Sequence, residues 1–220
     1  MLNLPLHYLY QSAASTVQKP WLLVLMHGVG SNAQDLFGLA PYVPPEFHVL
    51  SLRAPYTLGP GSYAWFAFGI NPDGSRTIDV AQERASRQLV AETVQQACAQ
   101  LQMPHDRVVL GGFSQGGIMA LSILLTRPQT LRAALVWHSR LLPQIADQEA
   151  AASALNGRSA WVSHGTADDV IVLAQAHAIR TRLQATPVDL DYHEYPCRHE
   201  IHPQELRDSM QWLQKLAVGG

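Results

Sequence analysis

Short apolar runs recur along the chain and predict the strands of a sheet. Trp21–Met26 is continuously apolar, which is typical of a strand that other elements cover on both faces. Leu6–Tyr10 alternates weakly between apolar and polar positions, and we expect it to form a strand at the edge of the sheet. Further strands are predicted at Phe47–Leu52, Arg107–Leu110, Arg132–Trp137, Ser159–Ser163 and Val188–Tyr195.

Amphipathic segments separate most of these runs and predict helices. In Asp79–Leu101 the apolar residues recur at helical spacing, and Pro104 follows the segment. Arg53–Thr77 is rich in Gly, Pro and aromatic residues, and we expect it to be irregular. Strands that alternate with helices predict an α/β fold with a mostly parallel central sheet and helices on both faces. The other helices are expected within residues 32–39, 118–125, 144–155, 173–184 and 203–216.

The composition is that of an ordinary globular protein. The 220 residues are 47% apolar and 15% charged, which favours one α/β domain that spans residues 1–220. The formal net charge is −2 and the sequence contains no run of Lys and Arg. We therefore expect neither nucleic acid nor an anionic membrane surface as a partner.

Cysteine content and the N-terminal sequence predict a cytoplasmic location. Cys98 and Cys197 do not suggest a disulfide framework and fit a reducing compartment. Residues 1–20 lack the basic start and apolar core of a secretory signal. The longest apolar run, Trp21–Met26, is far too short to cross a bilayer, so integral membrane association is not expected.

Gly112-Phe113-Ser114-Gln115-Gly116 lies between a predicted strand and a predicted helix. Strand, tight turn and helix are the context of a G-x-S-x-G nucleophile elbow, in which the serine hydroxyl stands clear of the backbone at the tip of a strained turn. We expect Gly112 and Gly116 to lie where a Cβ would collide with a neighbouring strand or helix. The N-terminus of the following helix favours a developing negative charge, so Ser114 is the predicted nucleophile.

The loop after the predicted strand Ser159–Ser163 supplies a catalytic acid. In hydrolases that use such an elbow, the acid follows the serine in the chain and the histidine comes last. Asp168 and Asp169 both lie in this loop, and only one of them can orient a histidine. The residues alone leave both open.

Three histidines near the C-terminus are candidates for the base. His193 lies within a predicted strand, and His202 precedes Pro203 where a helix-capping role is expected. His199 lies in a loop between the last strand and the last helix, where its imidazole can meet Ser114. We favour His199, which would take the serine proton during attack on a carbonyl carbon and return it to the leaving group.

Two backbone amides are expected to form an oxyanion hole. One is the N–H of Gln115, the residue after the nucleophile. The other is the N–H of Val29, in the loop that follows the strand Trp21–Met26 and resembles an HGGG-type hole. His27, in the same loop, is expected to make structural hydrogen bonds.

These motifs together resemble the phospholipase/carboxylesterase family, which includes bacterial carboxylesterases and acyl-protein thioesterases. The resemblance covers nearly the whole chain and implies an α/β-hydrolase fold with Ser114, Asp168 and His199 as the triad. It implies a serine esterase or thioesterase without cofactor or metal, and frequent homodimers. The matching segments are Leu25–Gly30 with Asp35-Leu36, Arg53-Ala54-Pro55, Tyr63–Phe66, Gly111–Gly117, His164-Gly165 with Asp168, and His199-Glu200-Ile201.

The substrate pocket is where the sequence departs from the family. Arg198 replaces the glycine that usually precedes the catalytic histidine, and it could narrow the site or turn to solvent. Trp137 and His138 stand where smaller residues are usual, and they could line a smaller acyl pocket or pack in the interior. Trp65 and Phe66 are expected either to wall an apolar acyl group or to fill the core.

The sequence thus predicts a serine esterase that forms an acyl-enzyme with carboxylic esters of short to medium acyl chains, with lysophospholipids among the candidates. The partner is then a small-molecule or lipid ester. A thioesterase acting on acylated protein or carriers would use the same triad. A catalytically silent binding protein with this fold is a third hypothesis. A metal hydrolase is not expected, because the histidines form no H-E-x-x-H pattern.

Overall fold

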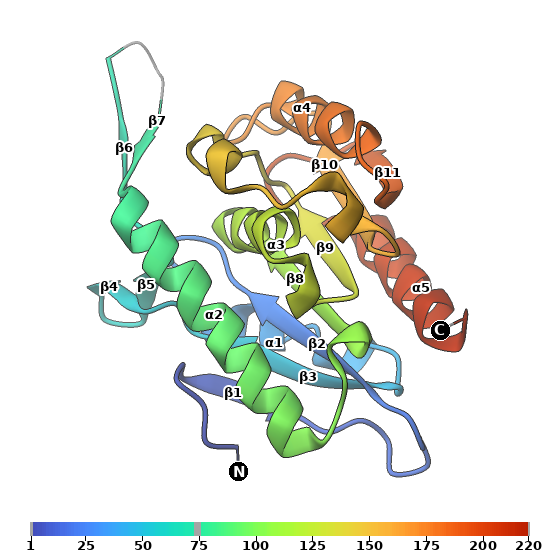
Figure 1. Cartoon of the computed structure of the whole chain (residues 1–220). Helices are drawn as coiled ribbons and strands as arrows, with labels where there is room; N and C mark the ends of the chain where they lie inside the picture. The colour runs from blue at the N-terminus through green and yellow to red at the C-terminus, as the bar shows by residue number, and fades with distance from the viewer. Residues whose placement is uncertain (1, 73–75, 220) are drawn as a thin grey trace.

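A computed structural model describes residues 2–72 and 76–219 (Figure 1). Its centre is a seven-stranded sheet with the strand order β1-β3-β2-β8-β9-β10-β11. Strand β1 runs antiparallel to β3 at one edge, and every other neighbouring pair in this sheet is parallel. The strands are β1 (Tyr8–Gln11), β2 (Trp21–Met26), β3 (Phe47–Leu52), β8 (Val108–Phe113), β9 (Ala133–Trp137), β10 (Ser159–Gly165) and β11 (Asp189–Tyr195).

Helices cover both faces of this sheet and create two hydrophobic cores. Alternate residues of β2 enter different cores: Leu22 and Val24 pack with residues of α2, α3 and α4, whereas Leu23 and Leu25 pack with residues of α1 and α5. This division explains why β2 is apolar at every position, and it confirms the predicted α/β architecture. The helices are α1 (Ala33–Phe37), α2 (Val80–Leu101), α3 (Gln115–Thr126), α4 (Leu173–Gln184) and α5 (Pro203–Gly219), with short 3-10 helices at Ala40–Tyr42, His105–Arg107 and Pro128–Thr130.

The region from Arg53 to Thr77 is more regular than predicted. It contains the hairpin of β4 (Tyr56–Gly59) and β5 (Ser62–Ala64), and the pair of β6 (Phe68–Ile70) and β7 (Arg76–Ile78). Gly61 has a φ of 72°, which only glycine adopts readily, and it closes the first hairpin. Residues 73–75 of this region lie outside the described residues.

The helix predicted within residues 144–155 is also corrected. The segment forms two 3-10 helices, Pro143–Gln148 and Ala152–Leu155, with an extended connection. The backbone N–H of Ala150 donates to the carbonyl of Leu125, near the end of α3, instead of to its own segment. This tertiary hydrogen bond interrupts the helical ladder and overrides the helix propensity of the alanines.

The turn between β8 and α3 is the closest backbone approach that bears on function. A Cβ at Gly112 would collide with the backbone of Gly116, and a Cβ at Gly116 would collide with the carbonyl of Met26 at the end of β2. The expected reason for these two glycines is therefore confirmed. Because neither glycine has a side chain, α3 can start directly against the end of the sheet.

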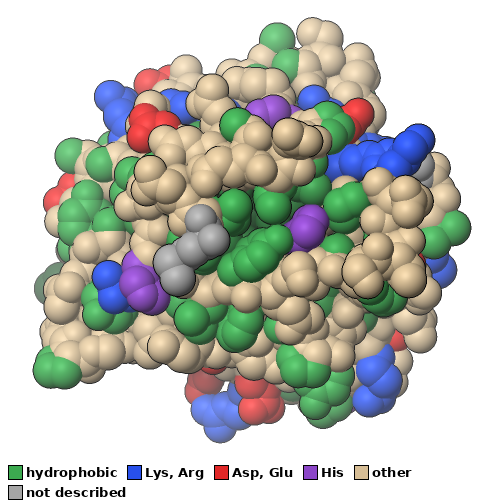
Figure 2. Space-filling model, turned by 90° about the horizontal axis from the view of Figure 1, so that it is seen from below, with side chains coloured by type: hydrophobic (Ala, Val, Ile, Leu, Met, Phe, Trp, Pro, Cys, Tyr) green, Lys and Arg blue, Asp and Glu red, His purple; other side chains and the backbone are tan. Residues whose placement is uncertain are grey.

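The surface on the lower side of the molecule in Figure 1 is mixed in character. Figure 2 views the molecule from below, where the chain begins, and shows hydrophobic side chains among polar ones, with Lys and Arg dispersed around the rim. No helix within residues 2–72 and 76–219 combines the length and apolar character needed to cross a membrane.

We predict that Gly116→Ala lowers the free energy of unfolding by more than about 3 kcal/mol, because a methyl group there meets rigid backbone. Urea denaturation followed by circular dichroism measures this change. Gly59→Ala is the matched control, since a Cβ at Gly59 meets open space and should change stability by less than about 0.5 kcal/mol. Equal stability of the two variants would contradict the proposed packing constraint.

Candidate functional site

Ser114 occupies the tip of the turn between β8 and α3 in a strained conformation. Its φ of 53° and ψ of −116° lie outside the regions favoured by residues that carry a side chain. Hydrogen bonds hold this backbone in place: the Ser114 N–H donates to the carbonyl of Trp137, and the Ser139 hydroxyl donates to the carbonyl of Ser114. The strain is thus maintained by the neighbouring strand β9 and the loop after it.

Three side chains that are far apart in the sequence meet at this turn. The Nε2 atom of His199 lies 3.0 Å from Ser114 Oγ, and its Nδ1 atom lies 2.7 Å from Asp168 Oδ2. The ring of Phe113 packs against the His199 ring with a centroid separation of 4.8 Å. The structure therefore brings together the nucleophile, base and acid candidates. Asp169 points away and forms an exposed ion pair with Arg198.

The carboxylate of Asp168 is buried and accepts hydrogen bonds on both oxygens. Its Oδ1 accepts from the backbone N–H groups of Val170 and Ile171, each at 2.9 Å. Its Oδ2 faces the rings of His199 and His138. Burial raises the pKa of this carboxyl, but the hydrogen bonds outweigh burial, and the net pKa is lowered. Asp168 is therefore held as a carboxylate.

His138 connects this carboxylate to a second buried acid. Its Nδ1 lies 3.0 Å from Asp168 Oδ2 and its Nε2 lies 3.2 Å from Glu205 Oε2. Only an imidazolium donates through both nitrogens. Burial lowers the pKa of His138, but hydrogen bonds and the negative charges of Glu205 and Asp168 raise it more, so the net pKa is raised. The side chains of Asp168, His138 and Glu205 thus form a buried network in which one imidazolium lies between two carboxylates.

Glu205 is the buried member of the site that the sequence analysis did not identify. It lies in the first turn of α5, and its Oε2 also accepts the backbone N–H of His202. A glutamate three residues after a capping residue is the pattern of a capping box, and this was the available signal. His202 accepts the N–H of Gln204 through Nδ1, which is the capping role expected for it.

The remaining histidines of the site make structural contacts. His27 is buried, its Nδ1 lies 2.7 Å from the carbonyl oxygen of Gly28, and its Nε2 accepts the N–H of Ala54. Burial lowers its pKa, so the ring is neutral, and the expected structural role is confirmed. His193 instead stacks on Trp161, with ring centroids 4.0 Å apart, and lies at the surface.

A narrow cavity opens beside Ser114 and contains both expected oxyanion donors. Val29 and Gln115 line it, and their backbone N–H groups donate to no group within residues 2–72 or 76–219. The cavity volume is about 20 Å³, which is room for little more than one water molecule. The lining residues are Val29, Phe66, Phe68, Arg76, Ser114, Gln115, Ile118, Arg140 and Ile171.

Of the five residues proposed for the substrate pocket, Phe66 lines this cavity and the other four lie elsewhere. Trp65 is fully buried, and its indole N–H donates to the carbonyl of His27. Trp137 is the buried last residue of β9, and His138 turns inward with a φ of 50° toward the two acids. Arg198 faces solvent with 70% of its side chain exposed.

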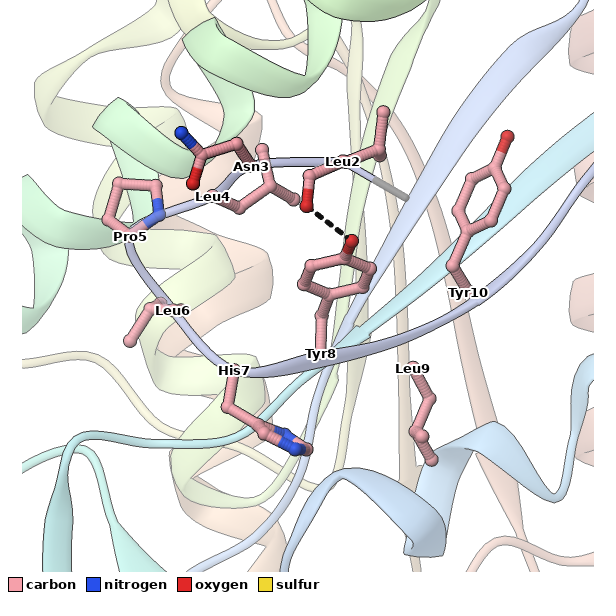
Figure 3. A pocket seen from close by; sticks show the side chains of 9 residues that line it. All are labelled: Leu2, Asn3, Leu4, Pro5, Leu6, His7, Tyr8, Leu9 and Tyr10. Atoms are coloured by element: carbon pink, nitrogen blue, oxygen red, sulfur yellow. Dashed lines mark hydrogen bonds between the residues drawn. The ribbon is translucent and has the colours of Figure 1, made fainter.

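A larger hollow, of about 730 Å³, lies along the N-terminal segment (Figure 3). Residues 2–10 line it, and the hydroxyl of Tyr8 donates to the carbonyl of Leu2 across it. The triad candidates do not contribute to its lining. The larger of these two cavities is therefore not the one beside Ser114.

Potential metal ligands overlap with the acid network. His138, Cys197 and Glu205 place their ligand atoms within 4.8 Å of one another, as do His138, His164 and Asp168. The same His138 and carboxylate atoms already form hydrogen bonds to each other. Burial raises the pKa of the Cys197 thiol to about 11, so it does not supply a thiolate near neutral pH.

Comparison with known proteins identifies the family of this chain. The model of the Phospholipase/Carboxylesterase family matches residues 11–217. The chain belongs to this family. It therefore has an α/β-hydrolase fold, and the family consists of esterase-type hydrolases. This finding confirms the resemblance drawn from the motifs.

Individual relatives of this phospholipase/carboxylesterase chain are distant. Acyl-protein thioesterase 1 of Mycosarcoma maydis is 31% identical over 121 residues, which are 52% of this chain and 50% of the relative. A probable carboxylesterase of Oryza sativa subsp. japonica is 27% identical over 86% of this chain and 85% of its own. The crystal structure of the Bacillus cereus carboxylesterase superposes with a TM-score of 0.82 at 25% identity, covering 96% of this chain and 94% of that chain.

The acid network predicts a characteristic dependence of stability on pH. Folding raises the pKa of His138, so its protonation stabilises the folded state. This contribution to the free energy of unfolding is fully present below the unfolded pKa of about 6.5 and is lost as the pH rises through the pKa of the folded state. Asp168 behaves oppositely, because its lowered pKa makes a contribution that is lost as the pH falls through the folded value. Stability should therefore decline on both the alkaline and the acidic side.

We predict that Glu205→Gln lowers the free energy of unfolding by roughly 3 kcal/mol at pH 6, because one partner of a buried charge is removed. Stability should also decline less above pH 6.5 in this variant, because the hydrogen bond and negative charge of Glu205 no longer raise the pKa of His138. Chemical denaturation from pH 5 to 9 measures both effects. Glu92→Gln, on α2, removes the same charge away from the network. An unchanged pH dependence in Glu205→Gln would refute the charged state of His138.

Proposed function

We propose that this chain is a serine esterase that hydrolyses carboxylic esters through an acyl-enzyme on Ser114. One observation carries the proposal: the imidazole of His199 lies within hydrogen-bond distance of both Ser114 Oγ, at 3.0 Å, and Asp168 Oδ2, at 2.7 Å. A base that touches the nucleophile on one side and an orienting acid on the other is the arrangement that activates a serine. Membership of the phospholipase/carboxylesterase family supports the same chemistry.

The proposed reaction begins with attack of Ser114 Oγ on the ester carbonyl carbon. His199 Nε2 removes the serine proton during the attack and then donates it to the leaving alkoxide, so that the alcohol departs and the acyl group stays on Ser114. A water molecule then enters, loses a proton to His199 and attacks the acyl carbon. The protonated His199 returns its proton to Ser114 Oγ as the carboxylic acid is released.

Backbone amides and one carboxylate would stabilise the charges that develop in this mechanism. Val29 and Gln115 line the cavity beside Ser114, and their backbone N–H groups would bind the negative oxygen of the tetrahedral intermediate. Asp168 would fix the tautomer of His199 and stabilise its imidazolium form. Each step uses only groups of the chain, water and the ester, so the mechanism requires neither a cofactor nor a metal.

The cavity supports a preference for short acyl groups. A volume of about 20 Å³ leaves room for about one water molecule beside Ser114, so the surrounding side chains would move less for a short acyl group than for a lysophospholipid chain. We therefore propose small-molecule esters with short acyl chains as substrates, ahead of medium chains and lipids. Homodimer formation and a cytoplasmic location remain predictions from the sequence.

A second candidate function is thioester hydrolysis. The 31% identical relative is named an acyl-protein thioesterase, and the same triad and oxyanion donors would cleave a thioester. Acetyl- and hexanoyl-thioesters assayed beside the matching oxygen esters distinguish the two functions. A higher kcat/KM for the thioester at each chain length would favour the thioesterase.

We predict that Ser114→Ala abolishes hydrolysis of p-nitrophenyl acetate while leaving the thermal unfolding temperature within a few degrees of wild type. A fluorophosphonate probe should label wild type on Ser114, as located by mass spectrometry of the peptide, and should not label the variant. Absence of labelling and turnover in well-folded wild type would instead favour a silent binding protein. Retained turnover in Ser114→Ala would refute the mechanism.

We predict that Asp168→Asn lowers kcat/KM by about 10³-fold or more, because the amide presents a donor to His199 and favours the wrong tautomer. Asp169→Asn is the matched control, since Asp169 pairs with Arg198 at the surface, and it should change kcat/KM less than about threefold. Steady-state kinetics at pH 8 compare the two. Losses of similar size would contradict the assignment of Asp168 as the acid.

A further inference from the structure

Two arginines from distant parts of the chain line the cavity beside Ser114. Arg76 is the first residue of β7, in the pair of strands that projects beyond the N-terminal end of α2 (Figure 1). Arg140 follows β9 in the loop whose Ser139 donates to the carbonyl of Ser114. Apart from Ser114 and Gln115, the remaining lining is apolar. The cavity therefore combines a nucleophile, two cations and an apolar wall.

Among residues 2–72 and 76–219, neither guanidinium has an acidic partner. Within the described residues, no carboxylate lies in ion-pair distance of Arg76 or Arg140, whereas Arg87, Arg182 and Arg198 each pair with one. The Nε atom of Arg140 is buried and has no hydrogen-bond partner among the residues that the structure describes, and its Nη1 donates to the carbonyl of Leu141 at 3.4 Å. Two positive charges beside one cavity therefore remain uncompensated within the described part of the chain.

The positions of these arginines are fixed rather than free. Arg76 Nη2 donates to the carbonyl of Val170 at 2.7 Å, in the loop that holds Asp168, and its guanidinium lies 5.6 Å from the centroid of the Phe68 ring. Arg140 is partly buried, and burial, together with the charge of Arg76, lowers the pKa of its guanidinium. A desolvated cation that faces a like charge gains most from an anionic ligand.

We propose that Arg76 and Arg140 form a subsite for a carboxylate of the substrate, so that the preferred substrates are short esters with a free carboxylate near the scissile bond. A guanidinium binds a carboxylate through paired N–H groups in one plane. Monoesters of short dicarboxylic acids carry such a carboxylate. The inference rests on the proposed esterase function and specifies its substrate class.

The direct test compares two substrates of equal length. Ethyl hydrogen succinate carries a carboxylate at pH 7.5, and ethyl succinamate carries a neutral amide in its place. We expect wild type to prefer the anionic ester in kcat/KM by about 10- to 100-fold, as hydrogen bonds to charged groups allow. Ethanol release measures both rates, and the preference should weaken as salt is increased from 0.02 to 0.5 M.

Arg76→Gln and Arg140→Gln should each lower the ratio of kcat/KM for the anionic ester to kcat/KM for the neutral ester by about tenfold or more. Arg84→Gln is the matched control, because Arg84 is exposed on α2 and does not line the cavity, yet its loss changes the net charge equally. If either variant folds poorly, competitive inhibition of wild type by succinate, compared with succinamide, gives the same information without a mutation.

The outcomes separate this inference from the proposed function. Equal rates of wild type with the two esters, or a preference that survives both Arg→Gln changes, would overturn the subsite and leave the esterase intact. If wild type hydrolyses neither these esters nor p-nitrophenyl acetate, the esterase proposal fails. Calorimetric titration with succinate then decides the subsite alone: binding that Arg140→Gln abolishes supports it, and no binding by wild type overturns it.

Discussion

The close approach of the α3 N-terminus to the end of β2 is the constraint on which the rest of the site depends. Gly116 lies against the carbonyl of Met26, and Gly112 lies against Gly116, so no side chain fits at either position. This contact forces Ser114 to bridge strand and helix with a φ of 53°. It also brings the Gln115 and Val29 amides to the same cavity, because Val29 follows β2 directly. The nucleophile and its oxyanion donors thus share one packing origin.

A second constraint holds the acid side of the site. Asp168 is fixed by two backbone amides of its own loop and by His138, which is in turn held by Glu205 at the start of α5. The start of α5 follows His199 closely in the chain. The helix that follows the catalytic base is thus tied to the catalytic acid through buried charges. Such a tie fixes the distance between acid and base more firmly than loop packing alone would.

Local sequence was sufficient to predict the elements that consist of a single pattern. The turn at Ser114 was predicted from the apolar run before it, the flanking glycines and the serine itself. The order of the motifs along the chain predicted which loops would meet. The inward turn of His138 could not be predicted, because it depends on two acids that approach from β10 and α5. Likewise, Arg76 and Arg140 reach one cavity only through the tertiary placement of β7 and the loop after β9. Two 3-10 helices replace the helix predicted within residues 144–155, because the Ala150 N–H donates to the carbonyl of Leu125, a tertiary hydrogen bond that the local sequence does not indicate.

Charge is distributed unequally on the two sides of Ser114. Behind His199 lie Asp168 and Glu205 with the cation of His138 between them, which leaves a net negative charge next to the imidazole. The cavity beside Ser114 is the positive side, because the two arginines and Gln115, at the N-terminus of α3, line it. Proton transfer from Ser114 to His199 creates a cation on the negative side and an oxyanion on the positive side. The proposed reaction therefore separates charge along the direction that the fixed groups of the fold favour. An additional carboxylate on the substrate would be held at the positive side, where it offsets two arginines that have no carboxylate partner in the described part of the chain, without neutralising Asp168.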